Sequence, residues 1–189
     1  MDLSKFIENV SKVNWNVFSY PDYYLEHIKP EERIPHALIS LASSVNVEPI
    51  TWKPEHNTAS PSLQAYVLNV IGNNHSGSYY PVIREALPFI IEVALDGNNA
   101  FCRNNAIHIL DLLCFTFSPE DGDLFIKKFV ETTIFEKKNN FTELAKTDNY
   151  NQSLIKEFVD CIIEVELENN KDKKDEVLTN IEKYSVEII

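Results

Sequence analysis

SGSYYPVIREALPFIIEVALDGNNAFCRNNAIHILDLLCF, residues 76–115, is the stretch that decides the fold class. Apolar residues recur every three or four positions in 82–94 and again in 106–117, which is the spacing of one face of an α-helix. Between these runs stands the turn sequence DGNN, where Asn98 or Asn99 can cap the following helix. The stretch therefore predicts two amphipathic helices joined by a tight turn.

Helical spacing also runs through the rest of the chain. Residues 46–59 lack any period and predict a long loop, and residues 168–176 predict a charged turn. No segment alternates apolar and polar residues as a half-buried strand does. The sequence therefore predicts an all-α chain whose helices cover, in order, residues 2–13, 21–27, 29–44, 60–71, 80–95, 98–117, 118–136, 150–167 and 177–184.

The helix expected after residue 117 begins with acids. Residues 118–121 (SPED) have the composition of a helix start, because proline suits the first turn and carboxylates favour the positive end of the helix dipole. We expect the inward face of this helix to carry Phe125, Ile126, Phe129 and Val130.

Length and charge limit the class of protein. The chain has 189 residues, the size of one domain, and its 44% hydrophobic content argues against a disordered chain. With 17 basic and 29 acidic residues the net charge is −12, which argues against a nucleic-acid binder because basic groups must displace counterions from phosphates. No signal segment or membrane-spanning run is seen, and the three cysteines form no CxxC pair. We therefore expect a cytoplasmic protein with reduced thiols and neither a membrane nor a nucleic-acid partner.

The order of the helices suggests an internal repeat. Residues 34–38 (IPHAL) resemble residues 87–91 (LPFII), and each segment precedes a second helix. Paired antiparallel helices with a proline in the first member describe HEAT-like repeats. We predict one all-α, HEAT-like domain over 1–189, a short α-solenoid of stacked antiparallel helix pairs. It would have a helical cap at 1–30, the repeat-like region at 31–117 and C-terminal helices at 118–189.

The entry into the second repeat carries a more specific pattern. Tyr80, Ala86 and residues 87–91 give Tyr-x5-Ala-Leu-Pro-Phe followed by two aliphatic residues. Over residues 33–117 the chain resembles small bacterial HEAT-repeat proteins that act as immunity proteins in polymorphic toxin and contact-dependent growth inhibition systems. The resemblance implies a non-enzymatic inhibitor that binds one cognate toxin domain and blocks its active site, and it supplies no catalytic residues. A basic partner, such as a nuclease toxin, is compatible with the acidic balance of the chain.

Candidate partner-binding residues follow from this interpretation. In HEAT arrays the second helix of each pair usually lines the concave surface, and aromatic side chains are favoured interface anchors. Acidic side chains suit a basic partner. The sequence therefore predicts a partner surface containing Trp52, Asn69, Asn73, Tyr79, Arg103, Asn104, His108, Asp111, Glu120, Asp121 and Asp123.

Two other functions stay open on the sequence. One is a protein-binding scaffold unrelated to toxins, and the other is a HEAT-like DNA glycosylase, for which the charge is unfavourable. His108 and Asp111 stand three residues apart on one helix and would form a general base, but no nucleophile is tied to them. Residues 120–123 (EDGD) lack the ligand spacing of a calcium loop. We therefore expect no enzyme activity, metal, cofactor or small-molecule substrate.

Overall fold

A computed structural model describes residues 1–25, 29–43 and 62–186 of the chain, with side chains described as far as Asn170 except that of Tyr23. Helices dominate this part of the chain, as the periodicity predicts. The expected loop at 46–59 lies outside the described residues, and Trp52 with it. The helices are α1 (Leu3–Lys12), the 3-10 turn η1 (Trp15–Val17), α2 (Asp22–Leu25), α3 (Pro30–Ser43), α4 (Leu63–Ile71), α5 (Ile83–Asp96), α6 (Ala100–Asp111), the π-helix η2 (Leu112–Thr116), α7 (Leu124–Phe135), α8 (Lys138–Thr147) and α9 (Gln152–Val186).

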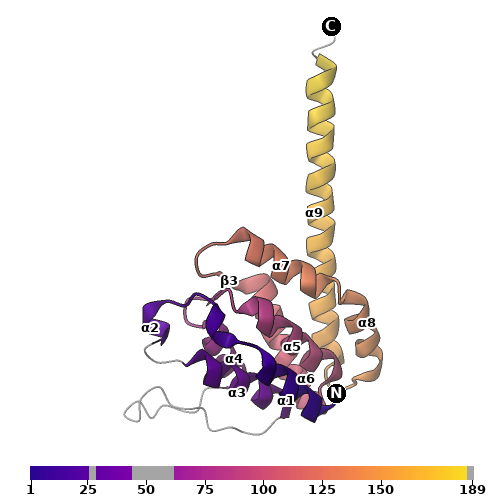
Figure 1. Cartoon of the computed structure of the whole chain (residues 1–189). Coiled ribbons are helices and arrows are strands. Elements are labelled where there is room, and N and C mark those ends of the chain that lie inside the picture. Colours follow the sequence, from indigo (N-terminus) through magenta and orange to yellow (C-terminus); the bar gives the residue numbers. More distant parts are fainter. Residues whose placement is uncertain (26–28, 44–61, 187–189) are drawn as a thin grey trace.

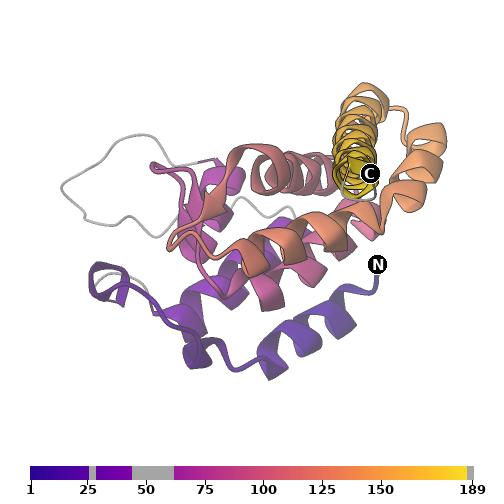
Figure 2. The same ribbon diagram turned by 90° about the horizontal axis from the view of Figure 1, so that it is seen from above.

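The helices contact one another in two rows. One row runs α1, α3, α5 and α7, and the other runs α4, α6 and α9. Within pairs, α3 packs on α4, α5 on α6 and α8 on α9. Figure 2 shows α1 at one edge of the molecule and α9 near the opposite edge. The two helices predicted from residues 76–115 are thus the central pair.

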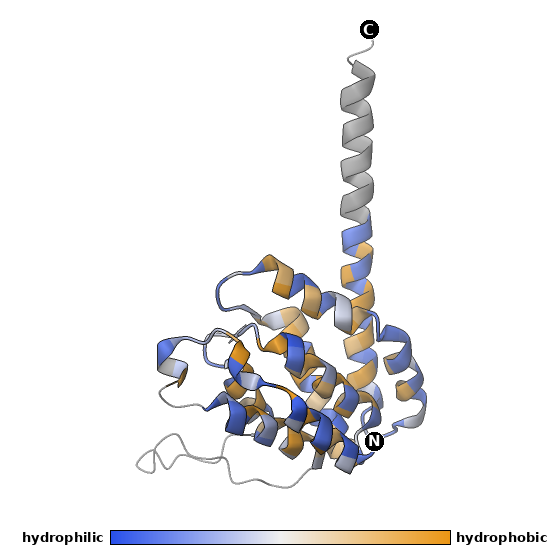
Figure 3. Ribbon diagram, viewed as in Figure 1, coloured by the Kyte–Doolittle hydropathy of each residue, from blue (hydrophilic) through white to orange (hydrophobic). Residues whose placement is uncertain are grey.

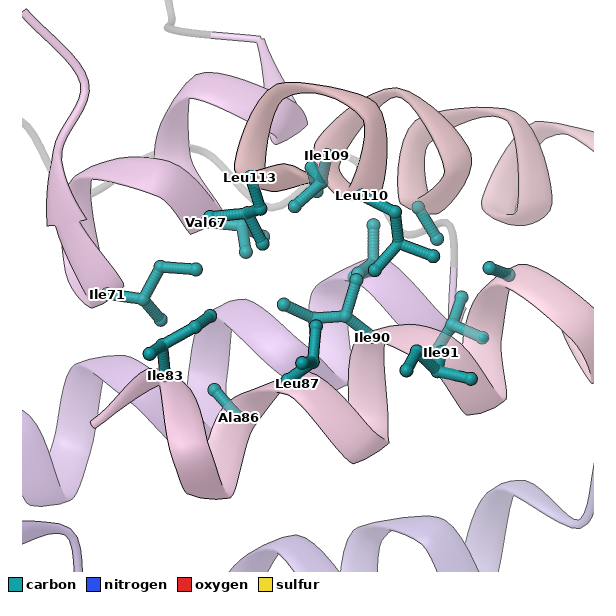
Figure 4. Close-up of a cluster of buried hydrophobic side chains, with 14 of the residues drawn as sticks. Val67, Ile71, Ile83, Ala86, Leu87, Ile90, Ile91, Ile109, Leu110 and Leu113 are labelled. Carbon is teal, nitrogen blue, oxygen red and sulfur yellow. The ribbon is translucent and has the colours of Figure 1, made fainter. Parts of the chain in front are cut away.

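The core is built where the two rows meet. Figure 4 shows Val67 of α4, Leu87 and Ile90 of α5, and Leu110 of α6 pointing toward one another. All four are fully buried, and burying a side chain of this size contributes about 1.5–3 kcal/mol. The same cluster of buried residues continues from α1 to α9. Burial of the apolar stripes therefore fixes the order of the helices.

Side-chain caps set where the helices begin. Asn99 Oδ1 accepts a hydrogen bond from Cys102 N at 2.9 Å, which confirms Asn99 as the cap of α6. The prediction that residues 118–121 begin the next helix is wrong, because Asp123 caps α7 through bonds from the backbone nitrogens of Phe125 and Ile126. This register turns Ile126, Val130 and Ile134 inward. Phe125, predicted to be in the core, is instead 82% exposed.

Three two-residue strands depart from the all-helical prediction. β1 (Gly72–Asn73) pairs antiparallel with β2 (Ser78–Tyr79), and β2 pairs in parallel with β3 (Ser118–Pro119). The sheet depends on Gly72, where a Cβ atom would lie 2.1 Å from the carbonyl oxygen of Ser78. Two residues are too few to display an alternating pattern, which is why the sequence gives no sign of these strands.

The last helix is longer than predicted. The expected charged turn at 168–176 is instead part of α9, one continuous helix from Gln152 to Val186. Its first turns pack on the body through Ile155, Phe158 and Ile162, and its later turns extend away from the body (Figure 1). Charged residues have adequate helix propensity, and residues 168–176 contain neither proline nor glycine. The run of charges in this segment therefore does not end the helix.

Candidate protein-binding surface

The polar edge of α6 was predicted to face a partner, but two of its residues are used inside the chain. Arg103 donates through Nε to Asp148 Oδ2 and through Nη1 to the carbonyl oxygen of Gly97, both at 2.7 Å. Asn104 Nδ2 donates to Asn151 Oδ1 at 2.9 Å. These contacts attach the turn between α8 and α9 to α6. Arg103 and Asn104 therefore hold the fold together rather than forming a free surface.

The remaining predicted residues of α6 are half-buried beside α9. Burial raises the pKa of Asp111, the charge of His108 opposes this effect, and the charge of Glu157 adds to it. Because Glu157 belongs to α9, Asp111 lies on the side of α6 that α9 approaches. Asp111 and His108 are thus at the edge of a helix contact, in a position with limited access for a partner.

Around the short sheet, the predicted residues also have internal roles. Asn73 Oδ1 accepts hydrogen bonds from His75 N at 3.1 Å and Ser76 N at 3.3 Å, which shapes the turn from β1 to β2. Asn69 is half-buried on α4. Tyr79 is 1% exposed, so the prediction of Tyr79 as a surface anchor is wrong. The side chain belongs to the buried core cluster, where Cys114 and Glu131 act on its pKa, and single-sequence periodicity does not reveal such long-range packing.

The three predicted acids gather before α7. Glu120 accepts a hydrogen bond from the hydroxyl of Ser78, and its backbone N donates to the carbonyl oxygen of Tyr79 at 3.0 Å. Asp121 Oδ1 accepts from Asp123 N at 3.2 Å, and Asp123 is the helix cap. Glu120 and Asp121 are nevertheless exposed, so they present carboxylates to solvent at the start of α7.

Two large apolar residues follow these acids directly and face solvent. Leu124 is 75% exposed and Phe125 is 82% exposed. Figure 3 marks the beginning of α7 as a hydrophobic segment at the surface. Sequence reasoning missed Leu124 and placed Phe125 in the core. The signal that could have found them is the cap at Asp123, since it assigns the buried face to residues 126, 130 and 134.

A groove runs from this point along α7. It is bounded on the other side by α9, and its volume is about 440 Å³. Lys127 Nζ and Glu131 Oε1 lie 3.9 Å apart within it. The groove is lined by Leu124, Lys127, Lys128, Glu131, Thr132, Phe135 and Asn169.

We define the α7 surface as Glu120, Asp121, Leu124 and Phe125 together with this groove. It combines exposed apolar side chains with charges of both signs, and contiguous apolar exposure of this kind is typical of a protein-binding site. Cys114 lies close to this surface, since the charges of Glu131 and Lys127 act on it. Burial, and then the charge of Glu131, raise the pKa of its thiol to about 12. A thiol with such a pKa stays protonated and is a poor nucleophile.

A second polar cluster lies between α3 and α4 and was missed by sequence reasoning. His36 Nδ1 and Tyr66 Oη are 2.9 Å apart. Burial lowers the pKa of His36, and the charge of Arg33 lowers it further. The same guanidinium opposes the rise that burial causes in the pKa of Tyr66. Arg33 and His36 share α3, but Tyr66 lies 30 residues after His36, so only the packing of α3 on α4 reveals the cluster.

The described residues contain no group of three or more histidine, cysteine, aspartate or glutamate side chains that could hold a metal ion. Within the same ranges, no helix is both long enough and apolar enough to cross a membrane. No protein-family model, curated protein or solved structure matches the chain.

Proposed function

We propose that this chain is a non-enzymatic immunity protein that binds a basic toxin domain, nuclease toxins included, and covers its active site. The observation that carries the proposal is the exposure of Leu124 and Phe125 directly beside the carboxylates of Glu120 and Asp121. An apolar anchor supplies affinity when a partner buries it, and surrounding charge of one sign selects a partner of the opposite sign.

The packing of the helices is compatible with this function. Helices α1, α3, α5 and α7 contact one another in that order, as do α4, α6 and α9, and this order supports the proposal that the helix pairs stack as HEAT-like repeats do. In this proposal α7 is the last helix of its row among the described residues, and its first turn exposes Leu124 and Phe125. A stacked array that ends in an uncovered apolar helix offers a ready interface.

Charge supports the choice of partner. The chain carries a net charge of −12, and such a field speeds the encounter with a basic protein and repels acidic ones. A toxin that acts on nucleic acid needs a basic groove for its substrate. Covering that groove would block the toxin without any chemistry by the inhibitor.

Binding and protection are the direct tests. The tagged chain should capture the product of the reading frame adjacent to its own, and co-expression should restore growth of cells producing that protein. Replacing both Leu124 and Phe125 by Ser should weaken binding at least about tenfold, because the anchor is lost. The matched control is Val17→Ser, a 66% exposed apolar residue on η1, which should bind as the parent does.

A charge variant tests the electrostatic part. Asp121→Lys should slow association and reduce its salt dependence, whereas Asp121→Asn should have about half the effect because it removes one charge instead of reversing it.

Capture of a non-toxin helical protein without growth rescue would favour the scaffold alternative. Absence of both capture and rescue would reject the immunity function.

A further inference from the structure

One face of α7 carries four residues in a regular order, of which Leu124 and Lys128 are exposed and Glu131 and Phe135 are partly buried. Leu124, Lys128, Glu131 and Phe135 are spaced i, i+4, i+7 and i+11, which places them within about 60° of arc on the helix. All four line the groove between α7 and α9. The order along the helix is apolar, basic, acidic, apolar. We call these four residues the α7 stripe.

Read in the opposite direction, the α7 stripe is complementary to itself. Two copies of α7 can be placed antiparallel about a two-fold axis that passes midway between Lys128 and Glu131. Lys128 then faces Glu131 of the second copy, and Leu124 faces Phe135 of the second copy. Each of these contacts occurs twice, because a two-fold interface uses the same residues on both sides.

We propose that the α7 stripe is a self-association surface and that its occupant is the α7 helix of a second copy of this chain. Charge complementarity favours this occupant, because Lys128 and Glu131 of the two copies carry opposite charges within an otherwise acidic protein. Lys127 and Lys128 make the groove the basic part of the α7 surface, while the approaching α7 brings Glu131 toward it. The Lys127–Glu131 pair at 3.9 Å is a loose, partly exposed contact, so it does not compete strongly for the carboxylate.

The size of the contact predicts a transient dimer. α7 has 12 residues and is therefore about 18 Å long. A single pair of such helices buries less than the roughly 800 Å² per partner of a standard stable interface. We expect a dissociation constant on the order of 10–100 µM. The dimer does not depend on the proposed toxin partner, but it covers Leu124 and therefore excludes that partner while it lasts.

Sedimentation equilibrium on the full chain, across a range of concentrations, tests the proposal. The average mass of the parent protein should rise toward twice that of the monomer. Lys128→Glu places two carboxylates opposite each other, and Glu131→Lys places two ammonium groups opposite each other. Each single variant should therefore associate at least about tenfold more weakly than the parent.

Mixing the two single variants gives the decisive result. In a mixed dimer, Glu at 128 of one copy faces Lys at 131 of the other, and the native Glu131 faces the native Lys128. Association should return to within about threefold of the parent in the equimolar mixture. The proposal is overturned if the parent stays monomeric, if both single variants associate like the parent, or if the mixture does not recover.

A third variant guards against loss of folding, since Glu131 lies near the buried Tyr79. Leu124→Asp changes a side chain that is 75% exposed, so the fold should be retained while the apolar contact is lost. This variant should associate at least about tenfold more weakly, and Val17→Asp should associate as the parent does. Equal association of the two would also overturn the proposal, whatever the result of the toxin assays.

Discussion

Arg103 Nε lies 2.7 Å from Asp148 Oδ2, and this ion pair attaches the turn between α8 and α9 to α6. The side chain of Asp148 is 3% exposed, and the same oxygen accepts a hydrogen bond from Asn151 Nδ2 at 2.8 Å. Arg103 also reaches Gly97, so one guanidinium joins the turn before α6 to the turn before α9. The C-terminal helices are thereby fixed to the central pair, which orients the neighbouring α7–α9 groove.

Removing this guanidinium should weaken the fold. Arg103→Ala should lower the free energy of unfolding by about 2–3 kcal/mol, because it leaves a buried carboxylate without its charged partner. Urea unfolding followed by circular dichroism measures the change. Lys12→Ala is the matched control, since it breaks an exposed pair with Glu8 and should cost no more than about 0.5 kcal/mol. Equal losses in the two variants would contradict a special role for Arg103.

The same pair should make stability depend on acid. Burial by itself raises the pKa of Asp148, but hydrogen bonds from Arg103 and Asn151 outweigh it and hold the pKa below its ordinary value. Its stabilising contribution is complete above the ordinary carboxyl pKa and is lost as the pH falls through the lowered pKa. Between about pH 5 and pH 2 the parent should therefore lose more stability than Asp148→Asn. Parallel curves of urea midpoint against pH would argue against this linkage.

The contribution of Asp111 to stability should depend on pH in the opposite sense to that of Asp148. Its pKa is raised, mainly by burial, so its contribution is complete below the ordinary carboxyl pKa and is lost as the pH rises through the raised pKa. At pH 7 the ionised side chain therefore costs stability. Asp111→Asn should be about 0.5 kcal/mol more stable than the parent at pH 7, and this advantage should shrink at pH 3. Thermal unfolding at the two pH values gives the comparison.

Gly72 should tolerate no side chain. A Cβ atom there would lie 2.1 Å from the carbonyl oxygen of Ser78 and 2.6 Å from Cα of Tyr79, so β1 and β2 would have to separate. Gly72→Ala should cost about 2–4 kcal/mol. Gly122→Ala has open space around the new atom and only its positive φ of 73° to strain, so about 1–2 kcal/mol is expected. Denaturant midpoints rank the two variants.

The hydroxyl of Tyr79 should be dispensable. Among the described residues it is a buried polar group without a hydrogen-bond partner, which is unfavourable for the folded state. Tyr79→Phe should leave the free energy of unfolding unchanged or raise it by about 1 kcal/mol, and should not alter partner binding. A loss above about 1 kcal/mol in urea unfolding would instead indicate that the hydroxyl is satisfied in solution.

Much of the candidate site could not be predicted from the sequence. The acids before α7 were recognised, because charged residues at a helix start form a local signal. Leu124 was missed and Phe125 was assigned to the core, because the helix was expected to begin at residues 118–121, whereas Asp123 caps it and both residues stand in its first turn. The polar residues of α6 carried no sign of their use, since Asp148 and Asn151 lie more than 40 residues further along the chain.

The sequence by itself determined the two helices of the central pair, a cap at Asn98 or Asn99 between them, and the apolar stripes that these two helices bury. These features depend on residues three or four positions apart, and such neighbours meet in any α-helix. The tertiary structure alone decided that Arg103 and Asn104 are structural, that Tyr79 is buried and that α7 keeps an open face. Exposure of a side chain is set by whatever packs against it, and that packing joins segments whose separation along the chain carries no local pattern.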